Sequence, residues 1–410
     1  GNPLNGVIIE VIGASLNEST DLFGFYATGT EAAGTYDVTF AKGGYLPQTI
    51  SGVTLVNGQL EILDVALTPD TPFLLSGAVT EEGSGNPIEG ATVQFVNPFF
   101  NIDLSSDASG NYTDNAFFAG QYEVTVAAWG YVGECMLVDL STSGTTPSFE
   151  LSAAYHDDFA LDLGWTTEGN AVRGGWVRAN PIETTFESFI ANPGVDSDGD
   201  CGDMAFITGN GGGTAGTDDV DDGITILKSP LMDLASYSNP HVHFDYWFFN
   251  DGSAANPNDA YLVKMDNGTD VVTLGSLPLT NNAWEHWSVE IESQLSLSST
   301  MQLIVEVEDE DPGHLLEGGL DKFRVTEGTS IDERETTSVS IYPNPSNNFF
   351  NLVVDEPGLV KVFDLSGKQI GIQETLMQGV NQIPVPSSAG VYLCEVLFNN
   401  ERHVKRLFVR

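Results

Sequence analysis

The chain of 410 residues is strongly acidic, with 14 Lys and Arg against 58 Asp and Glu and a formal net charge of −44. Such a surface repels nucleic acids and anionic lipids and attracts divalent cations, so we exclude nucleic acid as a partner. Hydrophobic residues make up 41% of the chain, as in ordinary folded proteins, so the acidity does not indicate disorder.

The sequence contains no run of 18 apolar residues, so it predicts no membrane-spanning segment. Its three cysteines, Cys135, Cys201 and Cys394, are odd in number and far apart in the chain. We therefore predict that no disulfide framework holds the fold. Cys394 lies in an apolar run, where it is expected to be a buried small hydrophobic residue.

An internal repeat occupies the first 152 residues. Gly1-Asn2-Pro3 returns as Gly85-Asn86-Pro87, Thr20-Asp21 returns as Ser106-Asp107, and Gly34-Thr35-Tyr36 returns as Gly120-Gln121-Tyr122. Short apolar runs alternate with glycine turns in both copies, which predicts two β-sandwiches of the Greek-key type. We place them at residues 1–68 and 73–152.

The two copies differ at their beginnings. The second copy starts with an apolar run, Phe73–Val79, that the first copy lacks. The first copy is therefore expected to be truncated at its N-terminus and to expose an unpaired strand edge. Both copies resemble the carboxypeptidase regulatory-like (transthyretin-like) family through their Gly-Asn-Pro, Ser/Thr-Asp and Gly-x-Tyr elements. The resemblance implies structural modules without an active site.

Residues 155–327 contain well-spaced apolar runs separated by long acidic loops and no convincing helix. This pattern predicts a jelly roll of two sheets. The segment resembles the jelly-roll adhesin domains of the MAM and cleaved-adhesin type. The resemblance rests on Asp158-Phe159, Gly164-Trp165, Leu227-Lys228-Ser229-Pro230 and Gly319-Leu320-Asp321.

A cluster of carboxylates in this segment suggests a calcium site. Asp196, Asp198, Asp200 and Asp203 stand at near-alternate positions, a spacing that can wrap an ion that prefers oxygen ligands. The loop is not an EF-hand, because Cys201 stands where the required glycine would be. By resemblance, calcium between the first and last strands adds Asp158 and Asp321. The alternative is a solvated acidic surface without bound metal.

Catalytic signatures are weak, so no catalytic or cofactor residue is assigned. His314-Leu-Leu-Glu317 matches the start of a zinc carboxypeptidase site, but we place it in a loop between glycine turns and interpret it as a chance match. His241 and His243 share one strand face and could clamp a metal only with a third ligand. Trp284 and Trp287 are interpreted as packing residues, and sugar stacking is the alternative.

The C-terminal segment, residues 338–410, predicts a further small sandwich from its short strands and Pro and Gly turns. Its charge is balanced, with six basic and six acidic residues, so the acidity of the chain lies upstream. The segment resembles the type A C-terminal sorting domain of the bacteroidete type IX secretion system. The matching residues are Tyr342, Pro343, Asn344, Pro345, Gly367, Lys368, Gly390, Tyr392, Lys405 and Arg406.

These features together predict an all-β protein of tandem β-sandwiches. The sorting resemblance implies export across an outer membrane, with the translocon and shuttle proteins of that system as partners and the cell surface as destination. Such cargo should begin with a signal peptide, so we expect the chain to be part of a longer protein. We predict adhesion or binding of a carbohydrate or protein ligand, with structural Ca²⁺. The alternative is the non-catalytic region of a secreted, zinc carboxypeptidase-like peptidase.

Overall fold

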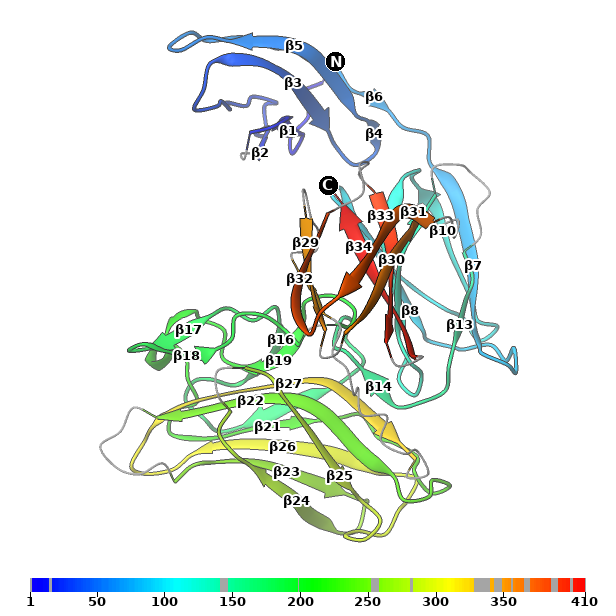
Figure 1. The fold of residues 1–410 in the computed structure, drawn as a ribbon, viewed down its shortest axis with the longest axis vertical. Helices are drawn as coiled ribbons and strands as arrows, with labels where there is room; N and C mark the ends of the chain where they lie inside the picture. Colours follow the sequence, from blue (N-terminus) through cyan, green and yellow to red (C-terminus); the bar gives the residue numbers. More distant parts are fainter. Residues whose placement is uncertain are drawn as a thin grey trace. The chain divides into compact units, whose positions relative to one another are not determined.

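The computed structural model describes residues 2–14, 17–140, 147–197, 199–251, 258–280, 283–327, 340–342, 349–354, 357–364, 369–384, 390–398 and 401–409. Within these ranges the chain is built of β-strands, and its one helical element is a short 3-10 turn, η1 (Ala215–Thr217). The predicted all-β class is therefore confirmed (Figure 1). No helix in these ranges is long and apolar enough to cross a membrane. The chain divides into two compact units, Gly1–Thr329 and Ser330–Arg410.

The two repeat copies share one sheet order. In the first copy the order is β2-β1-β3-β5, with the short pair β4-β6 beside it. In the second copy, β9-β8-β11-β12 follows the same order, and a further sheet β10-β7-β13 completes the sandwich. The first-copy strands are β1 (Ile8–Val11), β2 (Asn17–Ser19), β3 (Gly34–Ala41), β4 (Tyr45–Leu46), β5 (Gln48–Leu55) and β6 (Thr68–Pro69). The second-copy strands are β7 (Phe73–Glu81), β8 (Thr92–Asn97), β9 (Phe100–Ser105), β10 (Asn111–Phe117), β11 (Gln121–Ala127), β12 (Glu134–Asp139) and β13 (Phe149–Leu151).

Equivalent side chains make equivalent hydrogen bonds in the two copies. The hydroxyl of Thr20 accepts the backbone N–H of Val7 at 2.9 Å, and the hydroxyl of Ser106 accepts that of Ala91 at 2.9 Å. The phenol of Tyr36 donates to the carbonyl four residues earlier at 3.0 Å, and so does the phenol of Tyr122. The residues that repeat in the sequence are thus those that close turns and corners, which explains why they recur.

The copies differ in how much apolar surface they bury. The second copy encloses a continuous core between its two sheets, with Phe95, Tyr112 and Tyr122 almost fully buried. The first copy has a smaller core, and several large apolar side chains stay exposed: Leu22, Phe23, Phe25, Leu60 and Ile62. A single sheet covers only one side of its apolar residues, so the remaining side faces solvent.

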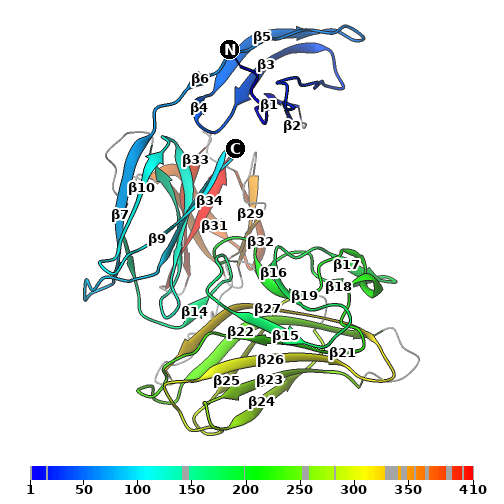
Figure 2. The same cartoon turned by 180° about the vertical axis from the view of Figure 1, so that it is seen from behind.

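Residues 155–327 form two facing sheets around the largest core (Figure 1). One sheet has the order β16-β19-β27-β22-β25, with β14 paired to β27, and the other has the order β15-β21-β26-β23-β24. A small sheet β18-β17-β20 lies outside them (Figure 2). The strands are β14 (His156–Asp157), β15 (Thr166–Gly169), β16 (Trp176–Ala179), β17 (Thr184–Phe186), β18 (Phe189–Asn192), β19 (Ala205–Thr208), β20 (Gly213–Thr214), β21 (Gly223–Lys228), β22 (His241–Asp251), β23 (Ala260–Asp266), β24 (Val271–Leu277), β25 (Glu285–Glu290), β26 (Gln302–Asp309) and β27 (Leu315–Thr326).

One prediction in this region is wrong. We placed His314-Leu-Leu-Glu317 in a loop that ends at a Gly318-Gly319 turn, but Leu315 to Glu317 and both glycines lie inside β27. A Cβ on Gly319 would stand 2.2 Å from the indole nitrogen of Trp247, and one on Gly318 would stand 3.1 Å from the ring of Tyr261. The glycines therefore allow large aromatic rings to pack against a central strand, and they do not mark a turn.

The second sandwich and the jelly roll are joined by a disulfide and an aromatic contact. Cys135 in β12 and Cys201 in the acidic loop form a disulfide with a Cα–Cα distance of 5.7 Å, which corrects the prediction that cysteines do not cross-link the chain. Trp129 donates its indole N–H to the carbonyl of Leu231 at 2.8 Å and stacks on Phe323 at a centroid distance of 5.8 Å. Closing a loop of 66 residues stabilises the fold by about 4 kcal/mol in the chain-entropy treatment.

The C-terminal unit consists of two small sheets, β28-β29-β32 and β31-β30-β33-β34. Its core includes Phe350, Val360, Val362 and Cys394. Cys394 is fully buried, as predicted, and burial raises the pKa of its thiol to about 12. The strands are β28 (Ser340–Tyr342), β29 (Phe349–Val354), β30 (Gly358–Asp364), β31 (Gln369–Leu376), β32 (Gly379–Pro384), β33 (Gly390–Phe398) and β34 (Glu401–Val409).

Candidate metal and ligand sites

Two predicted metal ligands lie on or directly beside the paired first and last strands of the jelly roll. In β14, His156 pairs with Arg324 and Asp157 with Phe323 of β27. Asp158 follows β14 directly, and Asp321 lies in β27 two residues before Phe323. Asp158 is 6% exposed and Asp321 is fully buried.

The acidic loop is tied to both of these carboxylates through its backbone. The N–H of Ser197 donates to Asp321 Oδ2 at 3.0 Å, and the N–H of Cys201 donates to Asp158 Oδ2 at 3.2 Å. The disulfide between Cys201 and Cys135 of the second sandwich also holds this loop. The loop therefore has little freedom to move away from the two buried carboxylates.

Burial and mutual repulsion disfavour the charged forms of these carboxylates. Burial raises the pKa of Asp321 to about 9, and the negative charge of Asp200 adds to the effect. Burial also raises the pKa of Asp200 to about 8; Lys322 opposes the shift, whereas Asp196 and Asp158 reinforce it. Oδ2 of Asp200 is buried and has no hydrogen-bond partner within the described part of the chain. This set is not one of the groups of described residues whose ligand atoms all lie within 4.8 Å of one another.

Neighbouring side chains orient the cluster. Asp245 of β22 pairs with Asp321 of β27. Its carboxylate accepts a hydrogen bond from the Ser197 hydroxyl at 2.6 Å and lies 2.9 Å from Nδ1 of His286. Burial opposes ionisation of Asp245, yet these hydrogen bonds and the charge of Lys322 lower its pKa. Asp245 is thus an ionised anchor for the loop.

The remaining predicted site residues are metal-ligand candidates of the acidic loop and residues of the sorting domain. Asp203 is exposed, and Asp196 is half-buried and acts on the cluster through its charge. Tyr342 lies in β28, Gly390 and Tyr392 lie in β33, and Lys405 and Arg406 lie in β34. The following predicted residues lie outside the described ranges: Asp198, Pro343, Asn344, Pro345, Gly367 and Lys368.

A second group of possible metal ligands was missed in the sequence. Asp259, Asp309 and His314 each offer one ligand atom, and these atoms lie within 4.8 Å of one another. The sequence signal was present in His314 but was interpreted only as part of a His-x-x-Glu motif. The structure gives the two ends of that motif different partners, since His314 contacts Asp259 and Glu317 accepts the Thr184 hydroxyl at 2.7 Å.

The strand histidines and tryptophans have structural contacts. The rings of His241 and His243 lie 6.1 Å apart, and that of His286 lies 5.6 Å from His243. Trp284 donates to the carbonyl of Val195 at 2.8 Å, and Trp287 packs on Phe244 at 5.0 Å. Both tryptophans are half-buried, in agreement with their interpretation as packing residues.

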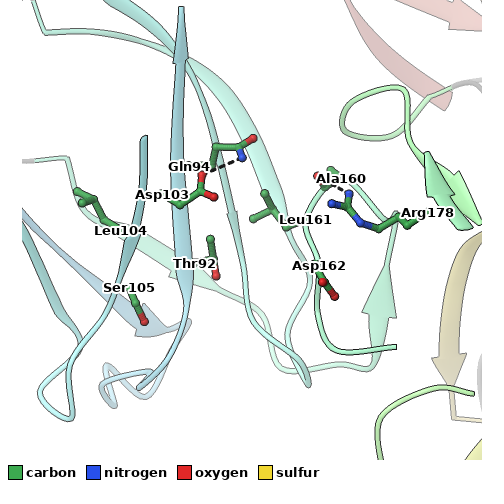
Figure 3. Close-up of a pocket in the computed structure, with 9 residues that line it drawn as sticks. All are labelled: Thr92, Gln94, Asp103, Leu104, Ser105, Ala160, Leu161, Asp162 and Arg178. Carbon is green, nitrogen blue, oxygen red and sulfur yellow. Dashed lines mark hydrogen bonds between the residues drawn. The ribbon is translucent and has the colours of Figure 1, made fainter. Parts of the chain in front are cut away.

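A polar cavity of about 250 Å³ lies where the second sandwich meets the jelly roll (Figure 3). One side presents Gln94 of β8 and Asp103 of β9, which are hydrogen-bonded to each other at 2.9 Å. The other side presents Asp162 and Arg178, and Arg178 donates to the carbonyl of Phe159 at 2.8 Å. The cavity thus offers amide, carboxylate and guanidinium groups at one place.

Comparison with known families identifies the C-terminal segment. Residues 340–410 match the secretion system C-terminal sorting domain. This match confirms the predicted sorting domain, and with it secretion and interaction with the type IX machinery. No curated protein matches the chain.

Among solved structures, the chain is similar to the K2 cleaved adhesin domain of Lys-gingipain, with 16% identity, a TM-score of 0.30, and coverage of 43% of this chain and 99% of that one. It is also similar to TmCBM61 in complex with β-1,4-galactotriose, with 14% identity, a TM-score of 0.26, and coverage of 42% and 90%. At these identities and TM-scores the similarities say nothing about ligand or function.

Proposed function

We propose that this exported chain acts at the cell surface as an adhesion protein, and that it binds carbohydrate in the cavity between its second sandwich and its jelly roll. The observation that carries the proposal is the cavity itself, where Gln94, Asp103 and Arg178 present both donors and acceptors to one volume. Sugar hydroxyls are both donors and acceptors, so a mixed polar lining suits them.

The covalent junction supports this proposal. The Cys135–Cys201 disulfide and the stacking of Trp129 on Phe323 link the two domains that form the walls of the cavity. A site preformed in this way loses little conformational entropy when it binds its ligand. The two sandwiches, which we assign as regulatory-like modules on the motifs they share, would then act as spacers.

Structural calcium is the second part of the proposal. Asp158, Asp200 and Asp321 would hold Ca²⁺, and Asp196 would add to the negative field. The buried Oδ2 of Asp200 fits this role, because a buried carboxylate oxygen without a hydrogen bond is a costly group unless a cation neutralises it. Calcium would stabilise the jelly roll by linking its first strand, its last strand and the acidic loop.

Carbohydrate binding is tested with the full chain on a glycan array, followed by affinity measurement on any hit. The double variant Gln94→Ala/Asp103→Ala should weaken binding at least tenfold, which is the cost of about 1.4 kcal/mol of lost contact. The matched control Gln121→Ala/Glu123→Ala removes one amide and one carboxylate from exposed positions on β11 and should leave binding unchanged. Equal affinities of the two double variants would contradict the cavity as the site, and binding only to proteins would favour a protein ligand.

The resemblance of the repeats to modules that accompany peptidases favours a second candidate, the non-catalytic region of a secreted peptidase. In that case the chain should show no intrinsic glycan affinity. The two candidates also differ in cell adhesion. A surface-bound adhesin without its Gln94 and Asp103 side chains should adhere less to glycan-coated surfaces, whereas a peptidase region should adhere to the same extent as before.

A further inference from the structure

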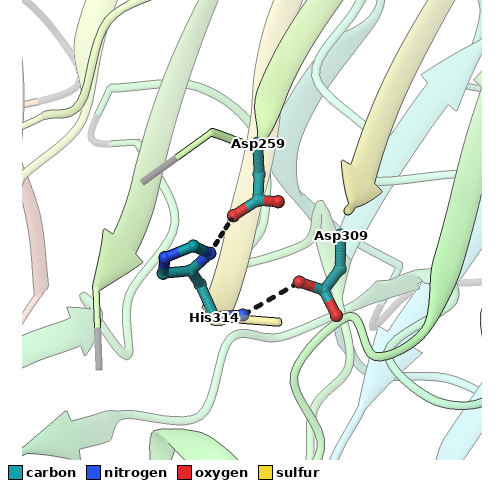
Figure 4. A group of neighbouring side chains, drawn as sticks. All are labelled: Asp259, Asp309 and His314. Carbon is teal, nitrogen blue, oxygen red and sulfur yellow. Dashed lines mark hydrogen bonds and ion pairs between the residues drawn. The ribbon is translucent and has the colours of Figure 1, made fainter. Parts of the chain in front are cut away.

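The jelly roll carries a cluster of buried ligand groups that is separate from the proposed calcium site and unrelated to the proposed glycan site. It lies at one end of the five-stranded sheet, where neighbouring strands begin and end (Figure 4). Asp309 is the last residue of β26, Asp259 immediately precedes β23, and His314 immediately precedes β27. The antiparallel pairing of β23 with β26 brings Asp259 beside Asp309, because Ala260 pairs with Glu308.

Each carboxylate is held in place by the backbone. Asp259 Oδ1 accepts the N–H of Glu310 at 2.8 Å. Asp309 accepts the N–H of His314 on Oδ1 and that of Asp222 on Oδ2, both at 3.0 Å. Because these bonds fix the carboxylate positions before any ion arrives, the cluster needs little ordering to bind one.

The His314 ring is buried, and one of its two nitrogens has no partner within the described part of the chain. The side chains of His314 and Asp259 are fully inaccessible to solvent, and His314 Nδ1 lies 2.9 Å from Asp259 Oδ2. These two atoms are each other's partners, and the ring nitrogen without a partner among the described residues is Nε2 of His314. Leaving such a buried group unsatisfied costs about 1–3 kcal/mol, so its retention indicates a missing partner.

The donor set indicates the class of ion. One imidazole nitrogen and two carboxylates suit zinc and related first-row divalent ions, whereas calcium prefers oxygen ligands alone. A point equidistant from three atoms within 4.8 Å of one another is at most about 2.8 Å from each, against about 2.1 Å in zinc sites, so a small inward movement completes the geometry.

We propose that His314, Asp259 and Asp309 form a binding site for a divalent transition-metal ion, of which Zn²⁺ is the probe. Three protein ligands leave one position of a tetrahedral ion for water or for a further group. Asp221 and Asp222 lie close to Asp309 and would strengthen the negative field around the ion, with the charge of Asp221 partly balanced by Arg173 at 2.6 Å.

The test uses the full chain, stripped of metal by a chelator and then titrated with Zn²⁺ in the presence of excess Ca²⁺. Bound zinc is measured by equilibrium dialysis with elemental analysis. Co²⁺ in place of Zn²⁺ should give visible absorption that depends on the ligand set. His314→Gln should weaken zinc binding at least about tenfold, since even groups that only orient a metal ligand change affinity by about 10–100-fold. Asp259→Asn is the second variant and should have the same effect.

Two controls separate this site from its rivals. His286→Gln removes an exposed ring from the stacked strand histidines and should leave zinc affinity unchanged. Asp270→Asn removes an exposed carboxylate directly before β24 and should leave it unchanged as well. Zinc binding that survives both His314→Gln and Asp259→Asn would overturn the proposal. Loss of zinc binding in His286→Gln would also overturn it. A wild-type chain that binds no zinc would overturn it as well, and would mean that His314 and Asp259 form only a buried ion pair.

Discussion

At the scale of single residues, buried carboxylates dominate the chemistry of the jelly roll. Between residues 155 and 327 the chain has 31 acidic and 6 basic side chains, so few cations are present to neutralise them. Asp158 and Asp321 lie on or beside the paired first and last strands, and the charge of Asp200 acts on Asp321. Their repulsion is tolerable in the folded state if they are protonated or bind a cation.

The calcium proposal predicts a response of the full chain to chelation. Removing calcium should lower the melting temperature, and millimolar Ca²⁺ should restore it where Na⁺ of equal ionic strength does not. Ligand at a hundred times its Kd stabilises the folded state by roughly 2.7 kcal/mol. Asp321→Asn should abolish this response, whereas Asp203→Asn, a change at an exposed position in the same loop, should retain it. An unchanged melting temperature after chelation would contradict bound calcium and would mean that the acidic residues form a solvated surface.

Glu317 predicts a pH dependence that needs no metal. Burial raises the pKa of Glu317 to about 8. The hydrogen bond from Thr184 lowers this pKa, whereas the charges of Asp219 and Asp218 raise it further. The protonated form therefore stabilises the fold below pH about 4.5, and this contribution is lost as pH rises through about 8.

The variant Glu317→Gln should lose this dependence, because its amide cannot ionise. The measurement is urea unfolding between pH 5 and pH 9, for which the variant should show a smaller fall in stability than the wild type. Glu285→Gln, at an exposed position in β25, serves as the control and should follow the wild type. If the free energy of unfolding changes with pH in the same way in all three proteins, ionisation of Glu317 does not destabilise the fold.

At the scale of the elements, glycines in the central strand β27 determine how the two sheets pack. Gly319→Ala should destabilise the jelly roll by about 1–3 kcal/mol, since the added methyl group meets the Trp247 indole and overpacks the core. Gly29→Ala is the matched control, because no atom lies within 4 Å of the added Cβ there. Thermal unfolding followed by tryptophan fluorescence measures both. Equal melting temperatures would mean that the indole can move aside at no cost.

At the scale of the whole molecule, the sorting domain forms its own compact unit, Ser330–Arg410, with a core of its own. Deleting residues 338–410 should therefore leave the upstream unit folded but retained in the periplasm. Cell fractionation with surface labelling measures the location, and retention of the Cys135–Cys201 disulfide in the truncated chain checks its fold. Normal amounts of truncated protein at the cell surface would remove the sorting role from this segment.

The sequence by itself determined much of this protein. Runs of β-branched and aromatic residues between glycine turns predicted an all-β chain, because both signals are local properties of a few neighbouring residues. The repeat was visible for the same reason, since the residues that recur are those that close turns within each copy, such as Asp21 and Asp107. Landmarks of the sorting domain are likewise short and follow one another in order.

Only the tertiary structure decided which distant groups meet. Cys135 and Cys201 are 66 residues apart, and an odd cysteine count concealed their pairing. Asp259 is brought beside Asp309 by the pairing of β23 with β26, strands that are far apart in sequence, and His314 completes the group. Gly319 seemed to mark a turn because the indole that requires it belongs to another strand. Contacts of this kind depend on strand register and sheet order, which are set by the packing of the whole domain, and no short stretch of sequence carries that information.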